Sequence, residues 1–450
     1  MKKVNNLSFI LTLCVLTLCA AFVFFGCSDD KVVTTTQSAS PTTSTYDSRY
    51  AVEWMWLTSK IVADQSRDNP PQAGRIYSYA CIAIYQCVVP GMPLNRSLRG
   101  QLNGMPQMPA AYLTSEYDWP SVLTGAMPVM LRGLFRTLYN PSNVMINNIY
   151  DRQKQERLAL KDAAIIDRSI QYGEDVANRL LEWVDNDGFN EIQGLPYVPP
   201  PRTLNPANWE PVNPGDTAVE PYWGTLRTYA LPGADYDEVP PSFGFDSTVN
   251  SPFYNDEYEV YQIRANATQE QKDIALFWRD KQLTPQPPGH WVSILNQIVL
   301  RDNIKLDRAA ECYAYLGIAI GDAFIAAWYT KYKFNYLRPQ TYIRDYIQEG
   351  WTPFLPTPPF PDYPSGHSTS SGACSYVLTH LLGTVAFTDT THLRIGMSPR
   401  SFNSFYEAAV ECSNSRIYGG IHYRNACENG VIMGENIGQT IVNRIRLKFF

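Results

Sequence analysis

Residues 306–339 read LDRAAECYAYLGIAIGDAFIAAWYTKYKFNYLRP. From Leu306 to Lys331, apolar side chains recur at the three- and four-residue spacing that is typical of a buried helix. A more polar run follows and ends at Arg338-Pro339, where proline removes a backbone donor. The stretch therefore predicts a core helix whose end carries several cations.

Similar helical spacing recurs along most of the chain. Strand patterns are nearly absent, and we find no internal repeat and no strand-helix alternation. We therefore expect an all-α helical bundle. The further predicted helices cover residues 50–63, 72–88, 120–138, 144–184, 269–281, 292–300, 368–382, 401–417 and 425–447.

Three stretches interrupt this pattern. Residues 193–256 are rich in proline and aromatic residues, which excludes a helix and favours a long ordered loop that caps a surface. A second Pro-rich stretch spans Leu355–Gly366, and an irregular one spans Gly383–Pro399. We expect a bundle with long Pro-rich loops.

Composition limits the class of protein. The 450 residues are 45% apolar and 18% charged, which suffices for a sizeable core and excludes disorder throughout. The formal charge is −6, and no basic block of the kind that follows a phosphate backbone is present. Nucleic acid is therefore not an expected partner.

The N-terminus has the pattern of an export signal. Two lysines precede an apolar run from Leu7 to Phe25, and Gly26-Cys27 is followed by acidic and then Ser/Thr-rich sequence. This resembles a bacterial lipoprotein signal (residues 1–26) that is cleaved before a lipidated Cys27. We expect an exported lipoprotein anchored to the outer membrane, facing either the periplasm or the outside.

The remaining chain divides into a flexible tether at residues 27–46, an N-terminal helical region at 47–260 and a C-terminal helical region at 261–450. We expect the two helical regions to form one compact domain. No cysteine pair after Cys27 has zinc spacing, so we interpret these residues mostly as buried apolar groups, with one disulfide left open. They are Cys81, Cys87, Cys312, Cys374, Cys412 and Cys427.

Three separated segments bring chemistry to the ends of predicted helices. They are 331–339 (KYKFNYLRP), 363–367 (YPSGH) and 415–422 (SRIYGGIH). Arginine forks, a lysine, and the hydroxyl and amides at a helix N-terminus together suit a tetrahedral oxyanion. Two histidines could flank it, one as ligand or nucleophile and one handling a proton. Phosphate and vanadate are the natural occupants.

The spacing of these segments resembles that of a known superfamily. Lys-x6-Arg-Pro, Pro-Ser-Gly-His and Ser-Arg-x5-His are shared by type 2 phosphatidic-acid phosphatases, bacterial acid phosphatases and vanadium-dependent haloperoxidases. Aromatic residues at Trp328 and Phe360 are similar to those that line the cofactor pocket of chloroperoxidases. Asp280, in a stretch similar to a chloroperoxidase helix, would pair with an active-site arginine.

The resemblance implies a role for each motif residue. His422 would coordinate vanadium axially, and the Ser365 hydroxyl and Gly366 amide would bond the equatorial oxygens. His367 would bond the apical hydroxide and help peroxide bind, and Lys331 would also polarise the bound peroxide toward halide. The cations that neutralise the equatorial oxygens would be Lys331, Arg338 and Arg416.

One position departs from the family pattern. An acid usually follows the axial histidine by four residues and bonds its second nitrogen, but here Ala426 stands at that position. Asn425 lies on the same side of a helix as His422, so Asn425 or a backbone carbonyl is the expected substitute.

Three functions remain open on the sequence. The first is a vanadate-dependent haloperoxidase-like enzyme that oxidises halide with hydrogen peroxide. The second is an acid phosphatase that hydrolyses a phosphate ester through a phosphohistidine, with phosphate in the site. The third is a degenerate lipoprotein that binds other molecules through its aromatic loops. The halide, the organic substrate and the oligomeric state stay open.

Overall fold

The computed structural model describes residues 39–65, 69–112, 114–135, 137–281 and 283–449. Ser38–Phe450 form one compact unit. The predicted signal segment 1–26, Cys27 and the tether up to residue 38 lie outside the described residues.

Helices make up most of the unit, and the prediction of an all-α fold is confirmed. Within the described residues, the one sheet pairs β1 (Phe387–Asp389) with β2 (Arg400–Phe402) in antiparallel register. The helices are α2 (Arg49–Gln65), α3 (Pro70–Val88), α4 (Trp119–Leu134), α5 (Asn140–Leu158), α6 (Ala163–Val184), α7 (Phe189–Ile192), α8 (Pro252–Asn266), α9 (Gln269–Phe277), α10 (Gln286–Arg301), α11 (Leu306–Phe334), α12 (Pro339–Tyr346), α13 (Gly366–Leu382), α14 (Phe405–Tyr418) and α15 (Arg424–Arg444).

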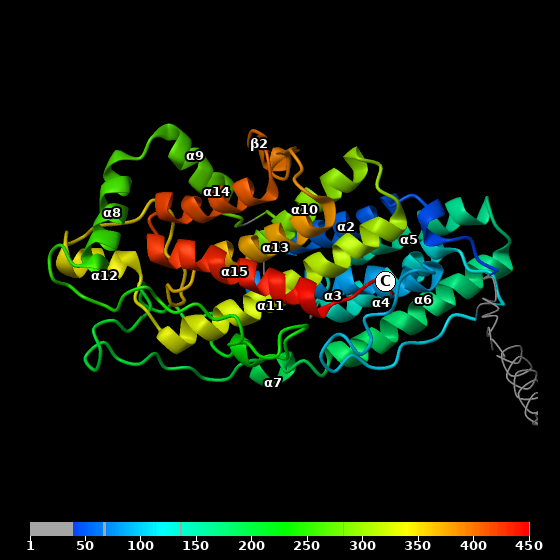
Figure 1. Ribbon diagram of the computed structural model, residues 1–450, viewed down its shortest axis with the longest axis horizontal. Helices are drawn as coiled ribbons and strands as arrows, with labels where there is room; N and C mark the ends of the chain where they lie inside the picture. Colours follow the sequence, from blue (N-terminus) through cyan, green and yellow to red (C-terminus); the bar gives the residue numbers. More distant parts are fainter. Residues whose placement is uncertain (1–38, 66–68, 113, 136, 282, 450) are drawn as a thin grey trace, which may run out of the picture. The chain divides into compact units, whose positions relative to one another are not determined.

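Helix α11 forms the centre of the core. It packs against α3, α13 and α15, and the last two run beside it through the middle of the bundle (Figure 1). Its length and composition would allow a membrane span, but its apolar window is entirely buried in the protein. The quoted stretch therefore serves as a core helix, as its spacing predicts.

Some predicted boundaries differ from the structure. The amphipathic stretch 144–184 is two helices, α5 and α6, because the chain becomes extended at Asp162. Helix α8 begins at Pro252 inside the expected loop, where the Ser251 side chain accepts a hydrogen bond from the backbone of Tyr254. The short α12 follows Arg338-Pro339, since proline is well tolerated in the first turn of a helix.

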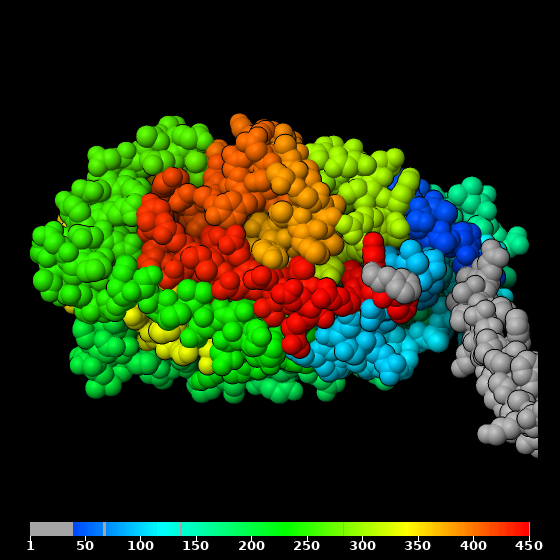
Figure 2. Space-filling model, in the orientation of Figure 1, coloured from blue at the N-terminus to red at the C-terminus, as the bar shows by residue number. Residues whose placement is uncertain are grey.

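The Pro- and aromatic-rich segment covers the C-terminal part of α11 and the chain that follows it. The amide of Trp209 donates to the carbonyl of Asn335 at 2.7 Å, and the amide of Val219 donates to that of Pro359 at 3.0 Å. Figure 2 shows this green segment on the surface, next to yellow residues of the 330–350 region. The buried carboxylate of Asp322 accepts three amide hydrogen bonds from residues 229–231, which fixes the segment to α11.

The crossing of α13 and α15 is unusually close because glycines meet there. A Cβ atom on Gly434 would collide with the carbonyl oxygen of Thr369, and one on Gly372 with that of Val431. Helix α13 begins at the Ser365-Gly366-His367 segment and α15 begins just after His422. The glycine contact therefore sets the distance between two of the three motif segments.

We predict that Gly434→Ala destabilises the protein by about 1–3 kcal/mol, because the new methyl group pushes against backbone rather than a movable side chain. Urea unfolding measures the change. Asn436→Ala, on the same helix at a partly exposed position, is the control and should stay within about 0.5 kcal/mol of wild type. A Gly434→Ala protein as stable as this control would contradict the close crossing.

Candidate active site

Hydrogen bonds to the backbone join the three motif segments. The amide of Ser365 donates to the carbonyl of Ala426 at 2.9 Å, and Arg338 donates from Nη1 to the carbonyl of Ile421 at 2.7 Å. Lys331 donates to the carbonyls of Pro361 and Asp362 at 3.0 and 2.8 Å. Residues that are up to 91 positions apart in the chain thus form one buried cluster.

The first segment provides two cations with no access to solvent. Lys331 lies in the last turn of α11, and Arg338 precedes α12 and donates from Nε to the carbonyl of Phe360 at 2.7 Å. Burial, and then repulsion from Arg338, holds the pKa of Lys331 well below its usual range. Burial also lowers the pKa of Arg338 to about 10, against the attraction of Asp362.

The second segment caps a helix and packs under aromatic rings. The Ser365 side chain caps α13, which begins at Gly366. It accepts hydrogen bonds from the amide and the hydroxyl of Ser368 in the first turn. A Cβ atom on Gly366 would stand 3.0 Å from the ring of Trp328, so only glycine fits closely there. The ring of Trp328 lies 5.1 Å from that of Phe360, and Lys331 Nζ lies 5.1 Å from the centre of the latter ring.

The third segment provides Arg416 from the last turn of α14 and His422 from the loop before α15. Arg416 donates from Nη1 to the carbonyl of Trp278 at 3.1 Å. The Nε2 atom of His422 lies 3.1 Å from Nη1 of Arg338. Burial, and then the nearby cations Arg338 and Lys331, holds the pKa of His422 well below its usual range.

A carboxylate that the sequence prediction did not include lies against His422. Oδ1 of Asp362 is 2.8 Å from Nδ1 of the ring, and Arg338 Nη1 is 3.7 Å from the same oxygen. Asn425, the expected substitute for the acid missing at Ala426, instead bonds the backbone and hydroxyl of Ser242. The side chain that faces the second imidazole nitrogen therefore comes from the Pro-rich stretch.

One sequence signal could have indicated this contact. Asp362 is the only acid between Trp351 and His367, and it lies three residues before Ser365. Burial raises its pKa to about 7, against the attraction of Arg338 and Lys331. Within the described residues, this carboxylate is the acid that comes within 4 Å of a motif cation or of His422.

Two buried guanidinium donors, Arg338 Nη2 and Arg416 Nε, and one ring nitrogen, His367 Nε2, have no hydrogen-bond partner in the described part of the chain, and neither have the two oxygens of Asp362. Burial, and then repulsion from Arg416, holds the pKa of His367 well below its usual range. Buried N–H groups without acceptors are costly, and a bound oxyanion would satisfy them. The cluster therefore fits a tetrahedral oxyanion such as vanadate or phosphate, held by the two arginines, Ser365 and the two histidines.

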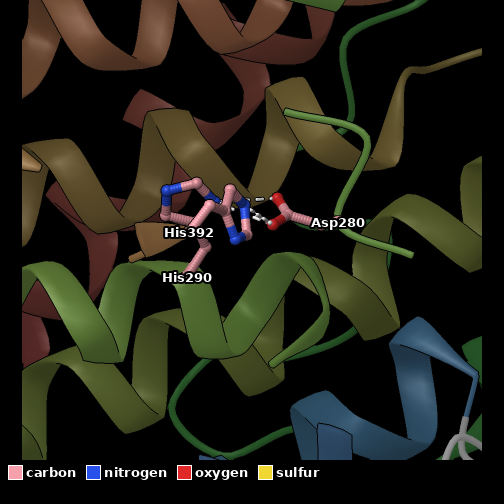
Figure 3. Close-up of side chains that lie close together, drawn as sticks. All are labelled: Asp280, His290 and His392. Carbon is pink, nitrogen blue, oxygen red and sulfur yellow. Dashed lines mark hydrogen bonds and ion pairs between the residues drawn. The ribbon is translucent and has the colours of Figure 1, made fainter. Parts of the chain in front are cut away.

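Behind this cluster, Asp280 joins two histidines to which the sequence assigned no role (Figure 3). Its carboxylate lies 2.8 Å from His290 Nδ1 and 3.0 Å from His392 Nε2, rather than on an arginine. On the other side of the ring, Nε2 of His290 lies 2.6 Å from Asp389. The ring also stacks on Trp278, whose carbonyl accepts the hydrogen bond from Arg416, so this cluster supports that arginine.

His290 lies between two carboxylates that favour its protonated form. Burial alone would lower its pKa, but Asp280 and Asp389 raise it to about 10. Burial opposes ionisation of Asp280 as well, yet the two histidines hold its pKa below its usual range. Removing the imidazolium would leave buried carboxylates without a counter-charge.

We predict that His290→Gln destabilises the protein by about 3–5 kcal/mol. The loss should be full between about pH 4 and 6.5 and should shrink as pH rises through about 10, since the raised pKa of His290 stabilises the fold only while the ring is protonated. Unfolding free energies measured against pH test this. The exposed His380→Gln is the control, and a pH-independent difference would contradict the charged assignment.

Comparisons with known proteins place most of the chain among proteins of one fold. Residues 311–449 match a family model described as the second helical-bundle domain of VCPO. The crystal structure of the first bacterial vanadium-dependent iodoperoxidase matches with a TM-score of 0.80 and 31% identity, over 90% of this chain and 97% of that one.

Two further structures share the fold. The apo-type bacterial vanadium-dependent chloroperoxidase matches with a TM-score of 0.63 and 16% identity, over 85% of this chain and 96% of that one. The holo-type structure matches with a TM-score of 0.61 and 17% identity, over 86% and 95%. No curated protein sequence matches the chain.

Proposed function

Because the chain belongs to the vanadium haloperoxidase superfamily, we propose that it binds vanadate in this cluster and oxidises halide with hydrogen peroxide. The observation that carries the proposal is the set of unpartnered buried nitrogen atoms on Arg338, Arg416 and His367. These come from all three motif segments. A dianionic or monoanionic oxyanion would satisfy them and offset the buried positive charge.

Bound vanadate would supply a Lewis acid that activates hydrogen peroxide. The guanidinium groups of Arg338 and Arg416 would hold the vanadate oxygens, and Lys331, which lies near the rings of Trp328 and Phe360, would add a positive charge. His422 would hold the vanadate through Nε2, which now faces Arg338. His367 presents an unpartnered Nε2, where a proton can be taken up or given back, and the aromatic rings exclude water.

We further propose that Asp362 replaces the acid that the family carries four residues after the axial histidine. Its Oδ1 atom lies 2.8 Å from Nδ1, close enough to take the proton of that nitrogen after a small change of angle, which would fix the tautomer. Nε2 now lies 3.1 Å from Arg338 Nη1, so this arginine would have to turn its donor to the oxyanion when His422 binds it. Ala426 lies in the first turn of α15, just after His422, and its carbonyl accepts from the amide of Ser365, so position 426 adjoins the cluster.

The same contact favours a second candidate, an acid phosphatase. A carboxylate that orients a histidine and stabilises its charge is also what a phosphohistidine nucleophile needs. The cluster would then hold a phosphate ester in place of vanadate. The two functions differ in what His422 does, as a ligand in one and as a nucleophile in the other.

We predict iodide or bromide oxidation that requires both vanadate and hydrogen peroxide, lowered at least about 100-fold in His422→Ala, because the axial ligand is lost. Hydrolysis of a chromogenic phosphate ester without vanadate tests the alternative. Phosphatase turnover that vanadate inhibits would replace the peroxidase assignment. His380→Gln serves as a matched control, and silence of the folded wild type in both assays would favour a binding lipoprotein.

The role of Asp362 has its own test. We predict that Asp362→Ala weakens vanadate binding about 10–100-fold, and that adding Ala426→Asp to this variant restores at least a tenth of the lost affinity. Vanadate titration monitored by melting temperature measures both. Asp362→Asn preserves the volume and should resemble Asp362→Ala. Unchanged vanadate affinity in the folded Asp362→Asn protein would exclude the proposed role.

A further inference from the structure

A cavity of about 290 Å³ opens beside the oxyanion cluster. Arg416 and Phe360 line it, so it shares a wall with the cluster. Its other walls come from the start of α3, the chain between α9 and α10, the loop residue Val219 and the Pro-rich stretch. The residues after α9 lie outside the three motif segments, and the resemblance gives a role only to Asp280 among them.

One side of the cavity is cationic. Arg279 and Lys281 flank Asp280 and line the cavity together with Arg416. The Nε atom of Arg279 is buried without a hydrogen-bond partner among the described residues, whereas the Lys281 side chain is exposed and is also attracted by Asp216 outside the lining. The pKa of Lys281 is lowered by burial and then by repulsion from Arg279. Two cations thus line the same cavity, and one of them has a buried donor without a partner.

No carboxylate in the lining balances these cations. Asp280 is the acid among the described lining residues, and both of its oxygens are within 3.0 Å of His290. The positive φ of 46° at Asp280 reverses the chain, so that its carboxylate is directed to the histidines while its two neighbours line the cavity. The cavity therefore has a net positive wall.

The opposite side is apolar. It consists of Leu355, Pro356, Pro358, Pro359, Phe360 and Ile421. A cavity of about 150 Å³ suffices for benzene, so about 290 Å³ leaves room for one substituted aromatic ring. The size and the two-sided lining fit a flat apolar body with one acidic group.

We propose that this cavity binds a small aromatic carboxylate, with the acid between Arg279 and Lys281 and the ring against the prolines and Phe360. We take this ligand to be the organic substrate beside the oxidising site, and this part of the proposal rests on the proposed function. The binding itself depends on the cavity alone. It requires neither peroxide nor halide.

Calorimetric titration of the vanadate-saturated protein with benzoate, and with neutral benzamide, tests the proposal. We expect benzoate to bind and benzamide to bind at least about tenfold more weakly, because only the acid can form charge-assisted hydrogen bonds. Arg279→Gln/Lys281→Gln should weaken benzoate binding at least about tenfold. Lys272→Gln, which removes one charge from α9 outside the cavity lining, is the control and should not.

Other outcomes would overturn the proposal. Equal binding of benzoate and benzamide, or unchanged affinity in the double variant, would exclude an acid-binding wall. Benzoate that binds only when vanadate is absent would lie in the oxyanion cluster instead. Because the titration involves no turnover, a protein that binds benzoate but fails to oxidise halide would contradict the proposed function and leave the cavity assignment standing.

Discussion

The site depends on one constraint, which is an excess of positively charged side chains in the protein interior. Lys331, Arg338 and Arg416 are all buried, and Asp362 is the acid among them. Burying a charge without a partner is strongly unfavourable, and burial lowers the pKa of all three cations. The folded state therefore gains stability from any anion that enters. Binding and catalysis would draw on the same imbalance.

The Pro-rich stretch makes this imbalance tolerable. Proline residues have no amide hydrogen, so the stretch cannot form a helix and its carbonyls remain free to accept. Lys331 uses three of them, at Pro361, Asp362 and Pro364, and Arg338 uses the carbonyl of Phe360. The same stretch carries Asp362 to His422. A segment that looks like a mere helix breaker thus supplies most of the acceptors around the cations.

The sequence predicts the helices well, because an apolar stripe on one face leaves the same pattern in any all-α protein. It fails where two amphipathic helices follow one another, as at Asp162, since the pattern continues while the backbone turns. It also fails for α12, whose eight residues are too few for a periodicity to emerge. The motif residues themselves come together as their order in the chain suggests.

The spacing of residues along the sequence does not predict contacts between distant segments. A helical pattern relates His422 to residues three or four positions away, so it indicated Asn425, whereas the acid that faces the ring lies 60 positions earlier. Likewise, His290 and His392 have no motif, and only the fold brings them to Asp280. Contacts between polar side chains from distant segments depend on the path of the backbone, which a local sequence pattern does not predict.

The turn after α9 connects the support of the cluster to the cavity beside it. Aspartate adopts a left-handed conformation more readily than most residues, and at Asp280 this reverses the direction of consecutive side chains. The Asp280 carboxylate thereby faces His290, and the two neighbouring cations line the cavity. The conformation of a single residue therefore separates a structural ion pair from a free cationic wall.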